Sequence, residues 1–209
     1  MLELELLLLA MVVIFVAGVT QSLTGFGFGL VAIPLLTLFM SPKLAPPVVL
    51  LDGLVLNLLI LRRSYPTVQV GRIWVLTLAG ICGVPIGVWI LANWDVNALR
   101  IYIGVMTCLA AALFLKGFER TIRNEKAASV PIGFVSGIMS GSINMSGPPV
   151  ILFFANQNLP RHIFRANIVA YFACLQVTGI PLMIAAGLMS KEAAATSALM
   201  LPGLFAGGM

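Results

Sequence analysis

The chain is 209 residues long, 60% of them hydrophobic and 9% charged, with a mean hydropathy of +1.08. Soluble domains carry about 25% charged residues, so this composition excludes an ordinary soluble protein and predicts an integral membrane protein. The net charge of +5 comes from 12 Lys and Arg residues that cluster in short loops. Basic residues distributed in this way report membrane topology and do not indicate a nucleic-acid surface.

The first apolar stretch, Leu6 to Pro42, contains no charged residue. It is too long for one membrane-spanning helix, which needs about 20 residues, and barely long enough for two. Its centre, GVTQSLTGFGFGLVAIP from Gly18 to Pro34, combines polar residues with alternating glycines. Each glycine costs about 1 kcal/mol relative to alanine inside a helix, and non-helical backbone at membrane depth needs protein or water around it. We therefore predict a broken helical hairpin over residues 4–40.

Three apolar segments follow in the first half of the chain. They predict membrane-spanning helices over residues 47–61, 73–92 and 99–116. The loop after the first segment carries Arg62, Arg63 and Arg72, and the loop after the third, KGFERTIRNEK, is the most charged of the chain. Residues 1–126 are therefore expected to form a first structural repeat.

The second uncharged stretch, Ala127 to Pro160, contains another break, GIMSGSINMSGPPVILFF. Aligning Phe15 with Phe134, a shift of 119, places FVAGVTQSLTGFG over FVSGIMSGSINMS. Glycine-interrupted apolar segments at matching positions in two halves are the best sequence indication of a transporter's binding site. The second repeat, residues 127–209, is predicted to contain a hairpin over 128–158 and helices over 166–188 and 192–209. A counterpart of the 99–116 helix is expected to be missing.

The basic loops predict the orientation of the chain. The loops around Arg63, Arg120 and Arg161 are expected in the cytoplasm, with Trp94 and Lys43 near the opposite face. This holds if each broken stretch enters and leaves on one face, because a single crossing would put Arg161 outside. An odd number of crossings then inverts the second half. The predicted fold is all-α: a polytopic membrane protein, multi-pass in the cell membrane, built from two inverted repeats.

The two breaks, QSLTGFGFGLVAIP and SGSINMSGPPVILFF, and the two-half layout resemble the TauE/SafE family of membrane permeases. The resemblance covers nearly the whole chain. It implies a transporter, and not an enzyme, that exports small sulfur oxyanions such as sulfite or organosulfonates. No cofactor and no metal are expected, and the partners would be the anion and the lipid bilayer. The early stop at Met209 departs from the complete second half that family members usually have.

The apolar stretches contain no Lys or Arg, so an anion would have to be held by backbone N–H groups and neutral side chains. A helix N-terminus offers free N–H groups and about half a positive charge. Two such termini are expected after the breaks, with a proline at the first position of the second one. Packing alone would also explain the small residues, but two breaks at equivalent positions favour a site. The candidate substrate-binding residues are Gln21, Ser22, Thr24, Gly25, Gly27, Gly29, Ser142, Asn144, Ser146 and Gly147.

Three further polar residues lie within apolar segments and are candidates for the pathway or for coupling. Asp52 is the one acid well inside such a segment, and it either carries a proton or reaches the interface beside Pro46 and Pro47. Asn57 and Gln176 are related by the shift of 119 and either line the pathway or form an interhelical hydrogen bond worth about 0.6 kcal/mol.

Two alternatives to a transporter follow from the residues. Ser146, in the sequence NMSGPP, could be the nucleophile of an intramembrane serine hydrolase, which would need a base within hydrogen-bond reach. The one histidine, His162, is expected in a cytoplasmic loop and argues against this role. A structural membrane subunit without transport activity would not require two polar breaks at equivalent depth.

Overall fold

The computed structural model describes residues 4–116, 125–157 and 159–208. Within these ranges the chain forms helices and no strand, which confirms the all-α fold. The helices are α1 (Leu4–Thr24), α2 (Phe28–Leu36), α3 (Ala45–Ser64), the 3₁₀ turn η1 (Tyr65–Thr67), α4 (Val70–Asn93), α5 (Val96–Lys116), α6 (Glu125–Ile143), α7 (Gly147–Ala155), α8 (Arg161–Ala185) and α9 (Lys191–Gly208).

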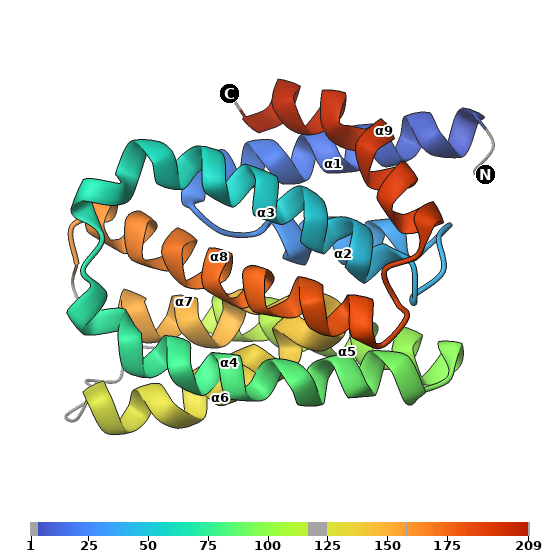
Figure 1. The fold of residues 1–209 in the computed structure, drawn as a ribbon. Helices are drawn as coiled ribbons and strands as arrows, with labels where there is room; N and C mark the ends of the chain where they lie inside the picture. The colour runs from blue at the N-terminus through green and yellow to red at the C-terminus, as the bar shows by residue number, and fades with distance from the viewer. Residues whose placement is uncertain (1–3, 117–124, 158, 209) are drawn as a thin grey trace.

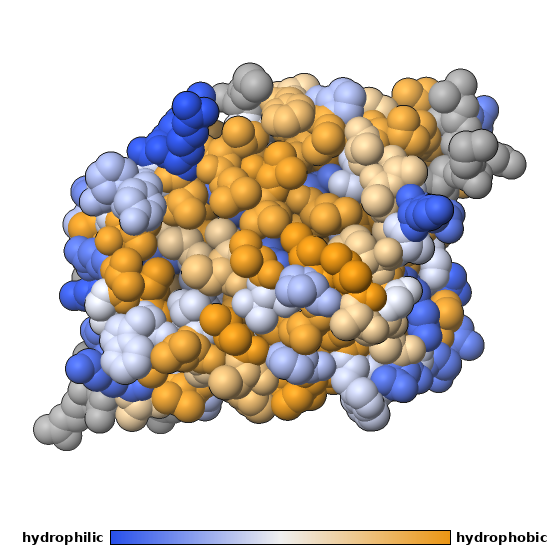
Figure 2. All heavy atoms as spheres, viewed as in Figure 1, coloured by the Kyte–Doolittle hydropathy of each residue, from blue (hydrophilic) through white to orange (hydrophobic). Residues whose placement is uncertain are grey.

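The helices and the molecular surface have the character of a multi-pass membrane protein. In the described part of the chain five helices are long and apolar enough to cross a membrane, by length and composition: α1, α3, α4, α5 and α8. Figure 2 shows an apolar surface across the middle of one face, with hydrophilic residues gathered towards its left and right margins. Such a band is what the hydrocarbon core of a bilayer requires of the protein surface that it covers.

Both predicted breaks are present. Non-helical backbone separates α1 from α2 at residues 25–27 and α6 from α7 at residues 144–146, a spacing of 119. Gly25 and Asn144, which this shift relates, both have positive φ angles of 87° and 51°. Because L side chains rarely adopt this conformation, each break starts at a residue type that tolerates it, glycine or asparagine.

The two broken helices point into the bundle from opposite ends (Figure 1). The start of α1 and the end of α2 lie at the right of the view, and the start of α6 and the end of α7 lie at the left. The α3–α4 connection and the start of α8 also lie at the left. Arg63 and Arg161 therefore share one end of the bundle, whereas Arg120 lies outside the described residues. At the other end the Lys43 ammonium donates to the Ala92 carbonyl, 3.0 Å away and close to Trp94.

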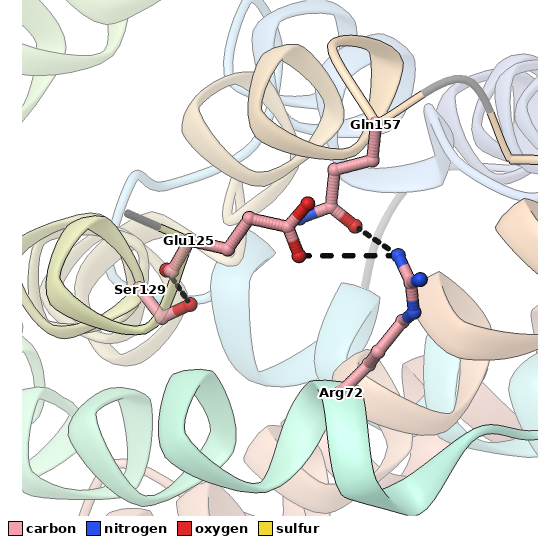
Figure 3. A network of polar contacts seen from close by, with 4 residues as sticks. All are labelled: Arg72, Glu125, Ser129 and Gln157. Carbon is pink, nitrogen blue, oxygen red and sulfur yellow. Dashed lines mark hydrogen bonds and ion pairs between the residues drawn. The ribbon is translucent and has the colours of Figure 1, made fainter. Parts of the chain in front are cut away.

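Polar contacts join α4, α6 and the turn after α7 at the left end of the bundle. Figure 3 shows the Arg72 guanidinium donating to Gln157 Oε1 at 3.3 Å, and pairing with the Glu125 carboxylate at 3.9 Å. Both members of the ion pair are partly exposed, so the pair contributes at most about 1 kcal/mol. These contacts align the three segments without carrying much of the stability.

Glycines bring two pairs of helices into backbone contact. A β-carbon at Gly137 of α6 would overlap the carbonyl oxygen of Gly80 in α4, and one at Gly83 would overlap that of Phe134. In the same way Gly207 of α9 lies against the carbonyl oxygen of Phe15 in α1. Small residues allow this close approach where lipid supplies no hydrophobic driving force. Under the shift of 119, α6 corresponds to α1 and α4 to α9, so the two pairs of helices in close contact are equivalent, although the glycines of α4 and α9 lie at different positions.

One expectation about a loop is wrong. The helix was predicted over residues 166–188, which left Arg161, His162 and Arg165 in the preceding loop, but all three lie in the first turns of α8. Pro160 has extended backbone angles and ends the connection, and the Phe164 N–H already donates to the Pro160 carbonyl at 3.0 Å. The helix therefore starts at Arg161, before the apolar segment from which a start at residue 166 was predicted.

Candidate functional site

A small cavity lies where α2 and α7 begin. Its volume is about 20 Å³, which is room for about one or two water molecules. The cavity joins residues from both breaks and from α3 and α8, and it includes six predicted binding residues and two predicted pathway residues. It is lined by Gln21, Gly27, Phe28, Gly29, Leu30, Asn57, Asn144, Met145, Ser146, Gly147, Phe172 and Gln176.

The sequence interpretation missed the apolar part of this lining. Phe28, Leu30, Met145 and Phe172 all contribute to the cavity wall. Their residue types are common throughout the chain, and only their place beside the breaks distinguishes the first three. Phe172 lies in the middle of α8, where the sequence gives no signal for it.

At the start of α2, N–H groups precede the first intrahelical hydrogen bond. That bond runs from Val31 N–H to the Gly27 carbonyl at 3.0 Å, so the N–H groups of Phe28, Gly29 and Leu30 are not used within the helix. Gly27 has a φ of 100°. Gly29 lies so close to the break of the other half that a β-carbon there would overlap the Asn144 carbonyl oxygen. The start of α2 is thus in direct contact with the second break.

The start of α7 is built differently. Gly147 is its first residue, and Pro148 and Pro149 take the second and third positions. The expected proline at the first helical position is therefore displaced by one residue. Because prolines have no N–H group, α7 offers the cavity the Gly147 N–H and the helix dipole. The side chains of Asn144 and Ser146, both 7% exposed, make no hydrogen bond among the described residues and remain available as donors.

Three buried amide side chains form a chain of hydrogen bonds along the cavity wall. Gln21 Oε1 accepts from the Phe28 N–H at 3.3 Å, and Gln21 Nε2 donates to Asn57 Oδ1. Asn57 Nδ2 donates in turn to Gln176 Oε1 at 2.8 Å. The exposed fractions are 2% for Gln21, 1% for Asn57 and 6% for Gln176. Gln176 Nε2, at the end of the chain, donates no hydrogen bond among the described residues.

The other predicted binding residues have partners outside the cavity. Ser22 Oγ donates to the Gly208 carbonyl at 3.1 Å, and Thr24 Oγ1 donates to backbone carbonyls next to the first break. Ser142 Oγ donates to the Ile138 carbonyl at 2.7 Å and faces Tyr102. Gly25 lies against the Arg165 side chain. These four residues shape and anchor the hairpins around the site.

Asp52 is a residue of α3 that is fully buried against α9 and does not line the cavity. Its exposed fraction is 0%, so it does not reach the interface beside Pro46 and Pro47. Ser197 Oγ donates to Asp52 Oδ1 at 2.5 Å, whereas Oδ2 has no partner among the described residues. A carboxyl group in such surroundings is costly in its charged form unless a cation or further donors accompany it.

Positive charge is absent from the described lining of the cavity. Arg165 is a cation close to this region. The residue was predicted to lie in the loop before the helix, but α8 begins earlier, and the Arg165 side chain lies against Gly25. No group of His, Cys, Asp and Glu residues that could hold a metal occurs in the described part of the chain. Ser146 lies at the cavity and His162 is exposed in the first turn of α8.

An all-helical chain with several apolar helices and polar breaks buried in its interior is a polytopic membrane protein of the transporter class. A family model described as "Sulfite exporter TauE/SafE" matches residues 10–209. The chain belongs to this family of membrane exporters. Comparison with curated proteins and with solved structures gave no match.

Proposed function

We propose that this member of the sulfite exporter family moves sulfite or a small organosulfonate, and holds the anion at the midplane between the starts of α2 and α7. The observation that carries the proposal is the cavity shared by the two helix starts and by buried amide and hydroxyl groups. Helix N-termini favour anions through free N–H groups and the helix dipole. The oxygens of a sulfonate or sulfite can accept hydrogen bonds from several directions at once.

Neutral donors suit a transport site better than a lysine or arginine would. A buried cation paired with the anion would require both charges to be separated again at each release. Backbone N–H groups and the amides of Asn144 and Gln176 hold an anion with partial charges only. Binding can then be favourable enough for entry and weak enough for exit.

The cavity is too small for the anion as it stands. At about 20 Å³ it has room for about one or two waters, and a sulfite ion is larger. We propose that the site widens when one hairpin moves against the other half, with the breaks as the moving contacts. Hairpins that enter from opposite ends, as inverted repeats would place them, could then expose the site to each side in turn.

The function is tested by anion flux in proteoliposomes. Purified protein should carry sulfite, or methanesulfonate as a chemically stable sulfonate, down a gradient faster than protein-free vesicles. Sodium, potassium and glucose should not be carried. Transport of a cation without any dependence on the anion would contradict the proposal.

We further propose that transport is coupled to protons through Asp52. The carboxyl is buried with one unpartnered oxygen and touches α9 through Ser197, so a change in its protonation acts on the contact between the two halves. No ion pair joins it to a described residue. The titratable or charged side chains on the elements packed against α3 are Tyr65, Arg161, His162, Arg165, Tyr171, Cys174, Lys191 and Glu192.

Asp52→Asn should abolish accumulation of methanesulfonate driven by a pH gradient and leave exchange of methanesulfonate across the membrane intact. Asparagine keeps the shape and can still accept from Ser197, but it cannot bind or release a proton. Methanesulfonate stays anionic over the whole pH range of the experiment, so any proton that crosses the membrane with it is carried by the protein and not by the substrate. The matched control is Asp95→Asn, an exposed acid that caps the start of α5. Undiminished pH-driven uptake by folded Asp52→Asn would remove Asp52 from coupling.

A further inference from the structure

The hydrogen bond between Gln21 and the start of α2 occupies a donor that the anion would use. Gln21 Oε1 accepts from the Phe28 N–H at 3.3 Å, and both residues line the cavity. We infer that the Gln21 carbonyl is an internal competitor of the substrate, standing where an anion oxygen binds and leaving when the anion arrives. This inference rests on the proposed anion site and gives Gln21 a different role in it from that of a simple donor.

The orientation of Gln21 is set by its neighbours. A primary amide has one acceptor end and one donor end, and the donor end of Gln21 is held by Asn57 Oδ1. Asn57 is itself oriented by its bond to Gln176 Oε1 at 2.8 Å. The acceptor end of Gln21 is thereby directed at the start of α2. The three amides hold the carbonyl in place in the substrate-free protein.

The second half has no equivalent competitor. The shift of 119 places Ser140 opposite Gln21, and its side chain is much shorter. Among the described residues nothing accepts from the Gly147 N–H. Asn144 and Ser146, which line the cavity and are each 7% exposed, make no side-chain hydrogen bond among the described residues and also keep free donors. An anion can thus contact the α7 side directly, whereas it must displace Gln21 to contact α2.

The size of the cavity supports the same sequence of events. With Gln21 in place the cavity has a volume of about 20 Å³, which is less than a sulfonate group needs. Movement of Gln21 away from α2 would free both the Phe28 N–H and the space that the amide fills. Binding of the anion is then linked to breakage of the amide chain that joins α1, α3 and α8. Displacement of Gln21 would in this way change contacts between helices of the first half, α1 and α3, and a helix of the second half, α8.

The inference is tested by the direction in which Gln21 variants change affinity. Gln21→Ala removes the competitor and should bind methanesulfonate and sulfite about fivefold more tightly, the size expected for one neutral hydrogen bond. Gln21→Glu puts a tethered carboxylate at the helix start and should bind both anions more than about tenfold more weakly. The matched control, Ser22→Ala, alters the next residue, whose hydroxyl bonds outside the cavity, and should bind like the wild type.

Isothermal titration of purified, monodisperse protein gives these affinities. Weaker binding by Gln21→Ala would show that Gln21 is an ordinary donor and would overturn the inference, as would wild-type binding by Gln21→Glu. Gln21→Met keeps the length of the side chain without its acceptor and should also bind more tightly than the wild type, so it decides the matter if Gln21→Ala does not fold. Absence of binding by the wild-type protein itself would instead contradict the proposed anion site.

Discussion

Gly147→Leu is expected to abolish anion binding in a protein that still folds. Gly147 is the first residue of α7 and lines the cavity, so a side chain there would keep an anion away from the helix start. A β-carbon would lie 2.9 Å from the Ile151 Cδ1 methyl, the end of a flexible side chain that can move. Gly27→Leu should also abolish binding. Its φ of 100° adds backbone strain, and this makes Gly147 the cleaner test.

Loss of single polar groups around Gly147 should have smaller effects. Ser146→Ala removes one neutral hydrogen bond, worth about 1 kcal/mol, and should weaken binding by less than tenfold. Asn144 has two amide donors and should rank between the serine and the glycine. Asn144→Gly is the suitable variant, because glycine tolerates the φ of 51° at this position. Titration with methanesulfonate gives the ranking. Wild-type affinity in folded Gly147→Leu would place the anion elsewhere and leave the break as a packing feature.

Gly137→Leu is expected to prevent assembly of the fold. Gly137 lies on α6 where the backbone of α4 is so near that a β-carbon would overlap the Gly80 carbonyl oxygen. Extra atoms in a packed interior typically cost about 1–3 kcal/mol, and here rigid backbone, not a side chain, would have to move. We therefore expect a loss at or beyond the upper end of that range. The yield of monodisperse protein and its melting temperature measure it.

The matched control for this variant is Gly104→Leu in α5. Nothing lies within 4 Å of a β-carbon at Gly104, and the residue is exposed. Both variants add the same side chain to the middle of a helix, α6 or α5, so a difference between them reports the contact between α6 and α4. Normal yield and melting temperature for Gly137→Leu would show that α4 and α6 can separate without loss of the fold.

The division of the chain into two inverted repeats stays a prediction, which several contacts support. Asn57 and Gln176, which the shift of 119 relates, hydrogen bond to each other. Residues related by a two-fold axis meet in this way when they lie next to the axis. Glycines also bring α4 against α6 and α9 against α1, and a two-fold axis that relates α4 to α9 and α6 to α1 relates these two pairs of helices to each other.

The sequence alone determined the features that depend on hydrocarbon as the solvent. A low content of charge, uncharged stretches of membrane length and glycines in their centres are sufficient to predict spans and breaks, because lipid penalises exposed charge and unpaired backbone wherever they occur in the fold. The breaks at residues 25–27 and 144–146 could therefore be placed closely. Loop ends were less certain, and Arg161 and Arg165 were assigned to a loop although they are helical.

Only the tertiary structure decided which polar residues share the site. Gln21 and Ser22 are neighbours in the sequence, yet Gln21 contacts the start of α2 and Ser22 bonds to α9. Neighbouring residues on a helix point in different directions, and the partner that each one meets depends on helices distant in the chain. For the same reason the sequence could suggest Asp52, but it could not show that Ser197 of the last helix covers it.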